Sequence, residues 1–371
     1  MDSRALLEHA LREATLELCW RQWTAAGLAG TREDTQTLID PEALLVASLA
    51  LGRYDARLFD EVLDWAAVNW RLLDTARLKR VARGASGTQR ALLAVVSQMA
   101  SGDRAAAKFR DELASAAAHR IADSGALQNL FFSQRPDEDS WVEPDPIFKA
   151  AGFLRPPARL RGLSRRPRAA NPACLRFRLR ALCGIGSRAE VLAYLLTHDW
   201  AHGRLIADRG AYPQGPVASY LVSLFEAGIV ERREEGKKAL YRLQGDLRLV
   251  AAEPPRFVDW IRVWPSLNAL LEAMRSTPAT EEAWWLRLAR SLGENQAALR
   301  AEGFDVEIGD LRGKKIGVTA PGSSTNMMAN FVLAKGGLKP SDVSFIGVGA
   351  GKGALAAVQS GQVDAIANLD P

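Results

Sequence analysis

The sequence LFEAGIVERREEGKKALYRL, residues 224–243, predicts the fold of the middle of the chain. Its first residues continue an apolar helical pattern that ends at Ala227–Gly228, because a glycine closes a helix readily. Two short alternating segments then flank a charged turn at Glu235–Gly236, which predicts a β-hairpin. We therefore expect a helix followed at once by a basic hairpin.

Two further helices are expected upstream of this one. Ser187-Arg-Ala-Glu190 has the spacing of a capping box and predicts a helix that begins at Ser187 and ends near His198. A second short helix fits His202 to Asp208. The third follows Gly215–Pro216 and carries its apolar residues on one face.

Three helices and then a basic hairpin is the element order of a winged helix. Over residues 187–243 the chain resembles winged helix-turn-helix transcriptional regulators of the MarR/ArsR kind. The resemblance implies double-stranded DNA as the partner, with base contacts from the outward face of the third helix and phosphate contacts from the hairpin. The base-contacting residues would be Gln214, Ser219, Tyr220 and Ser223, and the phosphate-contacting residues would be Arg232, Arg233, Lys237, Lys238 and Arg242.

Two features qualify the DNA interpretation. The third helix carries no arginine or lysine and ends with Glu226, so direct readout of guanine from it is not expected. Winged helices also serve as protein-docking modules, and the fold alone does not decide between the two.

Charge is sharply segregated beside this module. Residues 136–146 are acidic and proline-rich, whereas residues 147–189 contain no acidic residue. One explanation is a polyanionic partner such as nucleic acid; the other is a solvated linker whose arginines pair with carboxylates elsewhere in the chain. The basic residues are Lys149, Arg155, Arg159, Arg161, Arg165, Arg166, Arg168, Arg176, Arg178, Arg180 and Arg188.

Residues 1–135 predict a succession of helices. Asp40-Pro41-Glu42 is a helix start, with a capping carboxylate and proline at the first helical position. The apolar run that follows has no polar face, so that helix should be buried and should end at Gly52. We expect four tryptophans to be core residues: Trp20, Trp23, Trp65 and Trp70.

No motif predicts a metal, a cofactor or an enzyme. Cys19, Cys174 and Cys183 are widely separated, and we expect them to be reduced thiols. His198 and His202 fit capping and core contacts better than a metal site, and the Asp137–Asp139 pair fits a solvated linker. Without an export signal or an apolar stretch long enough for a bilayer, we expect a cytoplasmic protein that does not insert into membranes.

The sequence pattern changes at residue 311, after which strand and helix signals alternate. Residues 315–318 and 343–348 predict strands, residues 324–335 and 353–360 predict helices, and residues 365–367 predict a third strand. This βαβαβ order predicts a parallel sheet.

Residues 311–371, LRGKKIGVTAPGSSTNMMANFVLAKGGLKPSDVSFIGVGAGKGALAAVQSGQVDAIANLDP, resemble solute-binding proteins of ABC importers. The resemblance is to the branch that binds sulfonates, nitrate, taurine and thiamine-precursor pyrimidines. It implies that a small anionic or polar ligand meets Gly322, Ser323, Ser324 and Thr325 at a helix N-terminus. Such proteins have two lobes, so we expect this segment to be part of one lobe, joined to the body by a gene fusion or a shifted reading frame.

The expected fold is mainly α with a winged-helix (α+β) module, plus a C-terminal α/β fragment of a periplasmic-binding-protein-like lobe. The expected function is that of a DNA-binding transcriptional regulator, with homodimerisation left open. The alternative is a truncated or fused solute-binding component of an ABC importer for sulfonate-like or other small polar ligands. The expected divisions are a helical domain (1–135), an acidic then basic linker (136–172), the winged helix (173–247), C-terminal helices (248–306) and the partial lobe (311–371).

Overall fold

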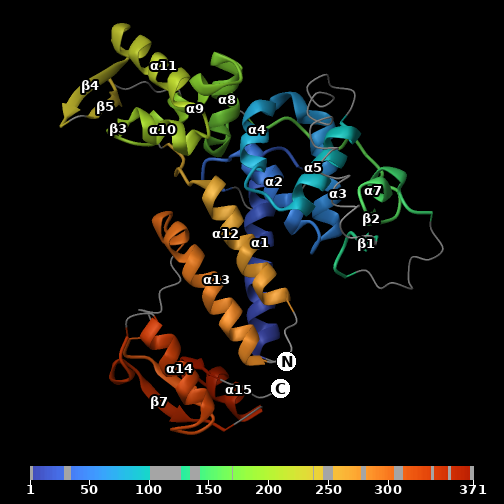
Figure 1. The fold of residues 1–371 in the computed structure, drawn as a ribbon, viewed down its shortest axis with the longest axis vertical. Helices are drawn as coiled ribbons and strands as arrows, with labels where there is room; N and C mark the ends of the chain where they lie inside the picture. The colour runs from blue at the N-terminus through green and yellow to red at the C-terminus, as the bar shows by residue number, and fades with distance from the viewer. Residues whose placement is uncertain are drawn as a thin grey trace. The chain divides into compact units, whose positions relative to one another are not determined.

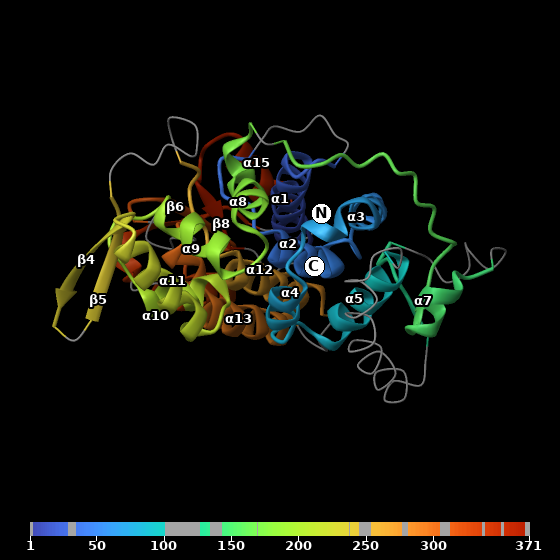
Figure 2. The same cartoon turned by 90° about the horizontal axis from the view of Figure 1, so that it is seen from above.

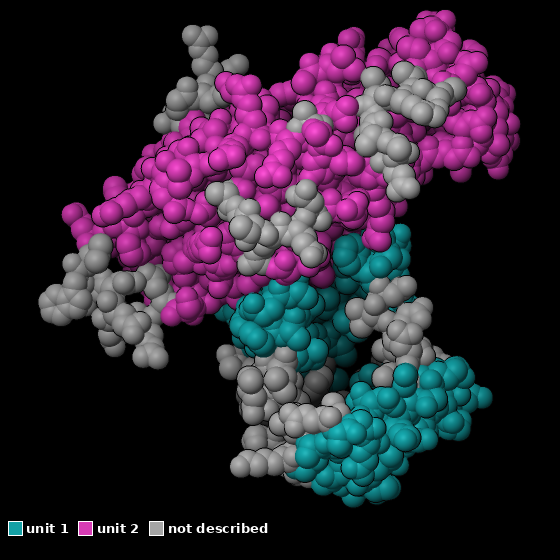
Figure 3. Space-filling model, turned by 180° about the vertical axis from the view of Figure 1, so that it is seen from behind, with its two compact units in different colours: residues 1–14, 269–371 teal, residues 15–268 magenta. Residues whose placement is uncertain are grey.

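The computed structural model describes residues 3–28, 35–100, 127–133, 143–168, 170–236, 238–244, 254–276, 281–304, 312–335, 338–349 and 352–367. Over these residues the chain is mainly helical, with a few small sheets (Figure 1). It forms two compact units, residues 15–268 and residues 1–14 with 269–371 (Figure 3).

The larger unit begins with a helical body built around one buried helix. Helix α1 is Ser3–Ala25, α2 is Pro41–Leu51, α3 is Ala56–Asn69, α4 is Thr75–Ala82 and α5 is Gly87–Met99; α1 starts in the smaller unit. Ten of the eleven α2 residues are buried, and α3, α4 and α5 all contact it. The Asp40 side chain accepts a hydrogen bond from the Ala43 amide at 3.1 Å, so the predicted start and burial of this helix are confirmed.

The four tryptophans lie in the core of this body. Trp23 and Trp65 meet edge to face, with ring centroids 4.7 Å apart. Their indole nitrogens donate to Ser48 Oγ at 2.7 Å and to the Ala26 carbonyl at 2.8 Å. Trp20 and Trp70 are also buried, so the prediction for all four residues is confirmed.

Residues 155–168, which we call the strap, cross the helical body in an extended conformation between the short helix α7 (Pro146–Ala150) and helix α8 (Leu175–Cys183) (Figure 2). The sequence predicted a loosely attached linker here. Instead, Arg155 bonds Asp60 of α3 at 2.6 Å, and Arg161 bonds Glu61 of the same helix. The strap is therefore part of the folded unit.

A single carboxylate fixes the middle of the strap. The buried Asp64 side chain accepts hydrogen bonds from the four consecutive amides of residues 161–164 and from the Ser164 hydroxyl, at 2.6–3.0 Å. Burial alone would raise the pKa of Asp64, but the amides of Gly162 and Ser164 outweigh it and the pKa is lowered. The carboxylate stays charged and holds the loop closed around it.

The remainder of the larger unit is a helix–hairpin module, residues 175–243. It contains α8, α9 (Ser187–Leu195), α10 (Gly203–Gly210) and α11 (Gln214–Glu226). Strands β3 (Ala201–His202), β4 (Val230–Glu235) and β5 (Lys238–Leu243) form an antiparallel sheet in the order β3-β5-β4. Val217, Leu221 and Leu224 of α11 are buried in the module's core, as their spacing predicted. Phe225, which the sequence placed on the same apolar face, is 44% exposed, so the prediction is wrong for this residue.

The predicted capping box of this module is wrong. Helix α9 is preceded by Gly186, whose φ is +151°, and the structure gives it no side-chain cap. Glu190 is buried and binds arginines instead, as described below. Helix α8 and strand β3 were not predicted, and α11 begins one residue before Gly215–Pro216, because the first turn of a helix tolerates proline.

Two small features complete the larger unit. Strands β1 (Gln128–Asn129) and β2 (Phe153–Leu154) pair in parallel beside α7. Single-turn 3₁₀ helices occupy Trp70–Leu72 (η1) and Pro172–Cys174 (η2). Helix α12 (Trp260–Arg275) leads out of this unit, and α13 (Glu281–Ala301) follows in the smaller one.

The smaller unit contains the predicted parallel sheet. Strand β6 is Lys315–Val318, β7 is Ser344–Gly347 and β8 is Ala365–Ile366; helices α14 (Ser324–Lys335) and α15 (Lys352–Gln359) connect them, with a 3₁₀ turn (η4, Pro340–Asp342) before β7. The order is β7-β6-β8, with all pairs parallel. The βαβαβ prediction is confirmed over these residues, which we call the C-terminal lobe (312–367).

Alternation along the central strand separates the two faces of this sheet. Ile316 and Val318 pack with Ala329 and Leu333 of α14. Gly317 lies between them and faces the other side, where a Cβ would come within 2.9 Å of side-chain carbons of Ile366 and Val348. The lobe thus has its own apolar core. Among the described residues, no helix is both long and apolar enough to cross a bilayer.

We predict that Asp64→Ala releases the strap. The substitution removes five hydrogen bonds to one ionised group and leaves their donors without an acceptor, so the free energy of unfolding should fall by about 2–4 kcal/mol. Urea unfolding measures the loss, and limited proteolysis within residues 161–164 should become faster.

Asp60→Ala is the matched control on the same helix. Its carboxylate is 42% exposed and forms one ion pair with Arg155, so its removal should cost about 1 kcal/mol or less. Equal effects of the two substitutions would contradict the assigned role of Asp64.

Candidate functional site

The loop between β6 and α14, residues 319–323, lies at the carboxyl edge of the parallel sheet. Its centre is exposed: Ala320, Pro321 and Gly322 are open to solvent, and Gly322 has a φ of +84°. Ser323 precedes α14, and its hydroxyl accepts the Asn326 amide at 3.3 Å. Ser323 therefore caps the helix.

The Thr325 side chain holds this loop in place through hydrogen bonds. It is 2% exposed. Its Oγ1 accepts the Thr319 amide at 2.9 Å, donates to the Thr319 hydroxyl at 3.2 Å and lies 2.7 Å from Ser323 Oγ. Asn326 adds an outer bond by accepting the Gly322 amide at 3.0 Å. The loop is consequently fixed before any ligand arrives.

Two backbone N–H groups at the start of α14 have no hydrogen-bond acceptor among the described residues. Within the described part of the chain, no hydrogen bond engages the amides of Ser324 and Thr325. The first-turn amides of a helix point beyond its N-terminus and carry a partial positive charge. Together with the exposed Gly322, they offer a place for an anionic or polar group.

The strand order puts this loop at a topological switch point. The chain leaves β6 toward β7 on one side, and then returns across β6 to β8 on the other. In open parallel sheets, ligands bind at the carboxyl ends of the strands where the order reverses. The loop after β6 occupies that position, between the ends of β6 and β8.

The sequence predicted the position of this loop, but not what each of its residues does. Gly322 and Ser323 lie at its surface and at its cap, and Ser324 contributes a backbone amide. Thr325 is buried, so its side chain stabilises the loop and does not face the solvent. Thr319 and Asn326 were not predicted; the signal would have been hydroxyl and amide residues on either side of PGSS. The resemblance to solute-binding proteins also implies ligand contacts from residues 349–351 and from Asp370; Gly349 is exposed, and residues 350–351 and Asp370 lie outside the described residues.

The basic residues of the hairpin lie in the larger unit and do not share one face. Arg232 is opposite the buried Tyr241 in the register, whereas Arg233 is opposite Leu240. Because successive residues of a strand point to opposite faces, Arg232 and Arg233 diverge. Arg242 shares a face with Arg233. Lys238 is exposed, and Lys237 lies outside the described residues.

Carboxylates accompany each of these arginines. Arg232 bonds Glu234 at 2.9 Å, and Arg233 lies 3.6 Å from Glu235. Arg242 bonds Glu231 at 2.8 Å and also approaches Asp199, and its pKa is raised by these two groups. The positive charge predicted for the hairpin is therefore largely compensated by neighbouring acidic residues.

An aromatic ring occupies the outer face of the hairpin. The guanidinium groups of Arg233 and Arg242 stand 4.4 Å and 4.7 Å from the centroid of Trp200. Cation–π contacts of this kind hold both arginines against the sheet. Trp200 was not predicted to have this role.

Helix α11 presents the predicted polar residues outward. Gln214, Ser219 and Ser223 are exposed, and Tyr220 is half-buried beneath the Arg188 guanidinium, 5.6 Å from its ring centroid. The Ser223 hydroxyl donates to the Ser219 carbonyl at 3.2 Å. His198 stacks on Tyr194 at 3.8 Å, and His202 accepts the Arg204 amide, so both histidines cap and pack as predicted.

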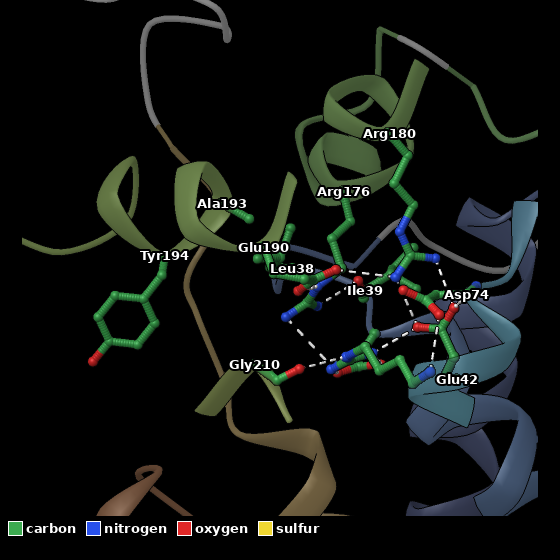
Figure 4. Close-up of polar contacts among 12 residues, drawn as sticks. Leu38, Ile39, Glu42, Asp74, Arg176, Arg180, Glu190, Ala193, Tyr194 and Gly210 are labelled. Atoms are coloured by element: carbon green, nitrogen blue, oxygen red, sulfur yellow. Dashed lines mark hydrogen bonds and ion pairs between the residues drawn. The ribbon is translucent and has the colours of Figure 1, made fainter. Parts of the chain in front are cut away.

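A buried ionic cluster joins the module to the helical body (Figure 4). Arg176 and Arg180 of α8 both bind Glu190 of α9, at 2.6 Å and 3.0 Å. Arg180 also binds Glu42 of α2 through two bonds of 2.7 Å and 2.8 Å. These four residues are all less than 6% exposed.

Arg77 of α4 completes the cluster. It binds Asp40 and Glu42 at 2.5–2.6 Å and donates to the Gly210 carbonyl at the end of α10 at 2.7 Å. Three guanidinium groups thus face three carboxylates, a balance that makes complete burial tolerable. Beside them, Asp74 caps α4 and accepts the Tyr212 hydroxyl.

The cluster keeps Asp40 and Glu190 ionised. Burial would raise the pKa of Asp40 and Glu190, but the neighbouring guanidinium groups reverse this and lower both. Burial raises the pKa of Tyr212, with the charges of Glu190 and Asp74 acting in the same direction. The pKa of Cys19, buried elsewhere in the body, is raised to about 12.

For four residues of the acid-free tract, the second of the two explanations applies. Arg155, Arg161, Arg176 and Arg180 pair with carboxylates from elsewhere in the chain. The described residues hold no group of three or more side chains suited to a metal, and the three cysteines are free.

Comparison with known proteins connects only the C-terminal part of the chain to a family. Residues 296–370 match the NMT1/THI5-like family. A solved structure of a Bordetella bronchiseptica RB50 protein is 64% identical over 20% of this chain, with a TM-score of 0.18. The match spans 23% of that protein. No curated protein matches the chain. The family match supports the resemblance to solute-binding proteins over this segment, and none of the comparisons supports a winged-helix regulator.

We predict that Glu190→Gln breaks the cluster. It leaves Arg176 and Arg180 buried with one carboxylate fewer, which should lower the free energy of unfolding by about 3–5 kcal/mol. Glu234→Gln is the control, because Glu234 pairs with Arg232 at the exposed hairpin surface; its effect should stay below about 1 kcal/mol.

The cluster also predicts acid sensitivity. Because the folded-state pKa values of Asp40 and Glu190 are lowered, their contribution is complete above the unfolded-state values near 4 and is lost as pH falls below them. Urea unfolding at a series of pH values should show this decline, less steeply in Glu190→Gln. A wild-type stability that stays constant through this range would contradict the assignment.

Proposed function

We propose that the C-terminal lobe contributes a binding surface for a small anionic or polar ligand at the carboxyl ends of β6 and β8. The observation that carries the proposal is the pair of unengaged amides of Ser324 and Thr325 at the N-terminus of α14, set at the switch point of the sheet. The family match over residues 296–370 supports it.

The proposed ligand would be held mainly by backbone groups. Gly322 has no side chain to obstruct approach to the loop, and Ser323 and Thr325 hold the loop in shape. An oxyanion such as a sulfonate or phosphate would accept from the amides, as anions do at other helix N-termini. We propose binding rather than catalysis, since the described part of the loop presents hydroxyls and amides without a general base.

The proposal predicts stabilisation of the full chain by small anions. Differential scanning fluorimetry and titration calorimetry with sulfate, taurine and inorganic phosphate would detect it, because a ligand that binds only the folded state raises its stability. No thermal shift or binding heat with any such anion would remove the proposal.

One substitution tests the donors themselves. Ser324→Pro deletes one first-turn amide while proline remains acceptable at the first position of a helix, so the lobe should fold and bind at least about tenfold more weakly. Val332→Ala, at an exposed position of the same helix, should bind as the wild type does. Equal affinities of Ser324→Pro and wild type would show that the ligand binds elsewhere.

The second candidate is DNA binding by the helix–hairpin module as a winged-helix transcriptional regulator. It is favoured by the element order α9-β3-α10-α11 followed by a hairpin in a three-stranded sheet. The compensated arginines described above weaken it, because a DNA phosphate would have to compete with their acidic neighbours. It would place the protein in the cytoplasm, where its free thiols would stay reduced.

This second candidate predicts salt-dependent binding to duplex DNA. Replacing Arg232 and Arg233 by glutamate should weaken binding to all sequences alike, because phosphate contacts carry no sequence information. Fluorescence anisotropy with labelled duplexes measures both effects. Affinity that is indifferent to this double reversal would remove the hairpin as a DNA contact.

A further inference from the structure

The strap separates the arginines of the acid-free tract into two groups. Arg155 and Arg161 turn toward α3 and pair with its carboxylates. The second group is exposed, and among the described residues no ion pair or hydrogen bond engages the guanidinium group of any of its members. These exposed residues are Arg159, Arg165, Arg166 and Arg168.

The backbone that carries the exposed arginines is fixed. Asp64 binds the amides of residues 161–164. The Arg165 amide donates to the Gly27 carbonyl at 2.8 Å, and the Arg165 carbonyl accepts from Asn69 Nδ2 at 3.0 Å. A partner would therefore meet arginines on an ordered chain and would lose less conformational entropy than with a flexible tail.

The acidic groups of the underlying helix do not neutralise these arginines. Asp60 and Glu61 are taken by Arg155 and Arg161, and Asp64 is enclosed by the strap's own amides. The inner side of the strap is thus electrostatically satisfied. The four exposed arginines keep positive charge that no carboxylate of the described residues pairs with.

We propose that Arg159, Arg165, Arg166 and Arg168 form a phosphate-contacting track for the backbone of a nucleic acid. Guanidinium groups bind phosphate in a bidentate manner, and the four exposed arginines are distributed along residues 159–168 of one ordered segment, as contacts with successive phosphates of a backbone require. The track contains no aromatic side chain for base stacking, so binding would be independent of sequence. Binding to this track would require neither the hairpin nor the C-terminal lobe.

An anionic membrane is less well matched to this surface. Peripheral binding needs apolar side chains that enter the lipid as well as basic ones. The strap exposes only two large apolar residues, Leu160 at 43% and Leu163 at 53%, on an extended chain and not on an apolar helix face. A nucleic acid needs only the arginines.

The test uses the full chain and a labelled mixed-sequence DNA duplex. Each phosphate contact contributes about 0.9 to the slope of log affinity against log salt, so four contacts predict roughly a hundredfold weaker binding for a fourfold rise in salt. Replacing all four arginines by glutamine should remove most of this slope. Replacing them by lysine, which keeps the charge, should preserve it.

Matched variants separate the strap from the other candidates. Far-UV circular dichroism and urea unfolding should show the glutamine and lysine variants folded alike, because the four side chains are exposed. The Arg232→Glu, Arg233→Glu variant should keep the strap's share of the salt dependence. Unchanged affinity and slope in the glutamine variant would overturn the proposal, whatever the hairpin variant does.

Vesicles that contain anionic lipid provide the contrasting probe. We expect the wild type to bind the duplex in preference to these vesicles, and Leu160→Ser with Leu163→Ser to leave duplex binding unchanged. Vesicle binding that is lost in the leucine variant, with no duplex binding by the wild type, would assign the surface to membranes and overturn the nucleic-acid proposal.

Discussion

The buried ionic cluster is the interaction on which the larger unit depends. Asp40, Glu42 and Glu190 face Arg77, Arg176 and Arg180 without access to solvent, and their partners come from the body and from the module. Ions in this setting are costly unless every one of them is paired. The cluster therefore specifies one relative position for α2, α4, α8 and α9, since any shift would leave a charge unpaired.

The same principle organises the strap. Its inward arginines and its amides satisfy three acidic residues of one helix, and this leaves four arginines for the surface. A tract with no acidic residues can thus be partly structural and partly available to a partner. Whether an arginine of the tract is structural or exposed depends on the carboxylates that other segments place beside it, and not on the tract itself.

Local features of the sequence predicted well where neighbours in the chain determine the structure. Helix α14 begins and ends at the predicted residues because hydroxyl residues and a glycine precede it and a consistent apolar pattern follows. Helix α2 was likewise predicted from a local helix-start signal, Asp40–Pro41. The cluster could not be predicted, because Arg180 and Glu42 are 138 residues apart. The capping box at Ser187 failed because Glu190 is engaged by this long-range cluster.

Hydrogen exchange at individual amides tests the central claim, that the cluster makes the helical body and the helix–hairpin module one cooperative unit. The account predicts that the slowest amides of α2 and α9 exchange with the same free energy of opening, and that Glu190→Gln lowers both equally. If the amides of α9 open at lower free energy than those of α2, and only the former respond to Glu190→Gln, the cluster does not join the two parts.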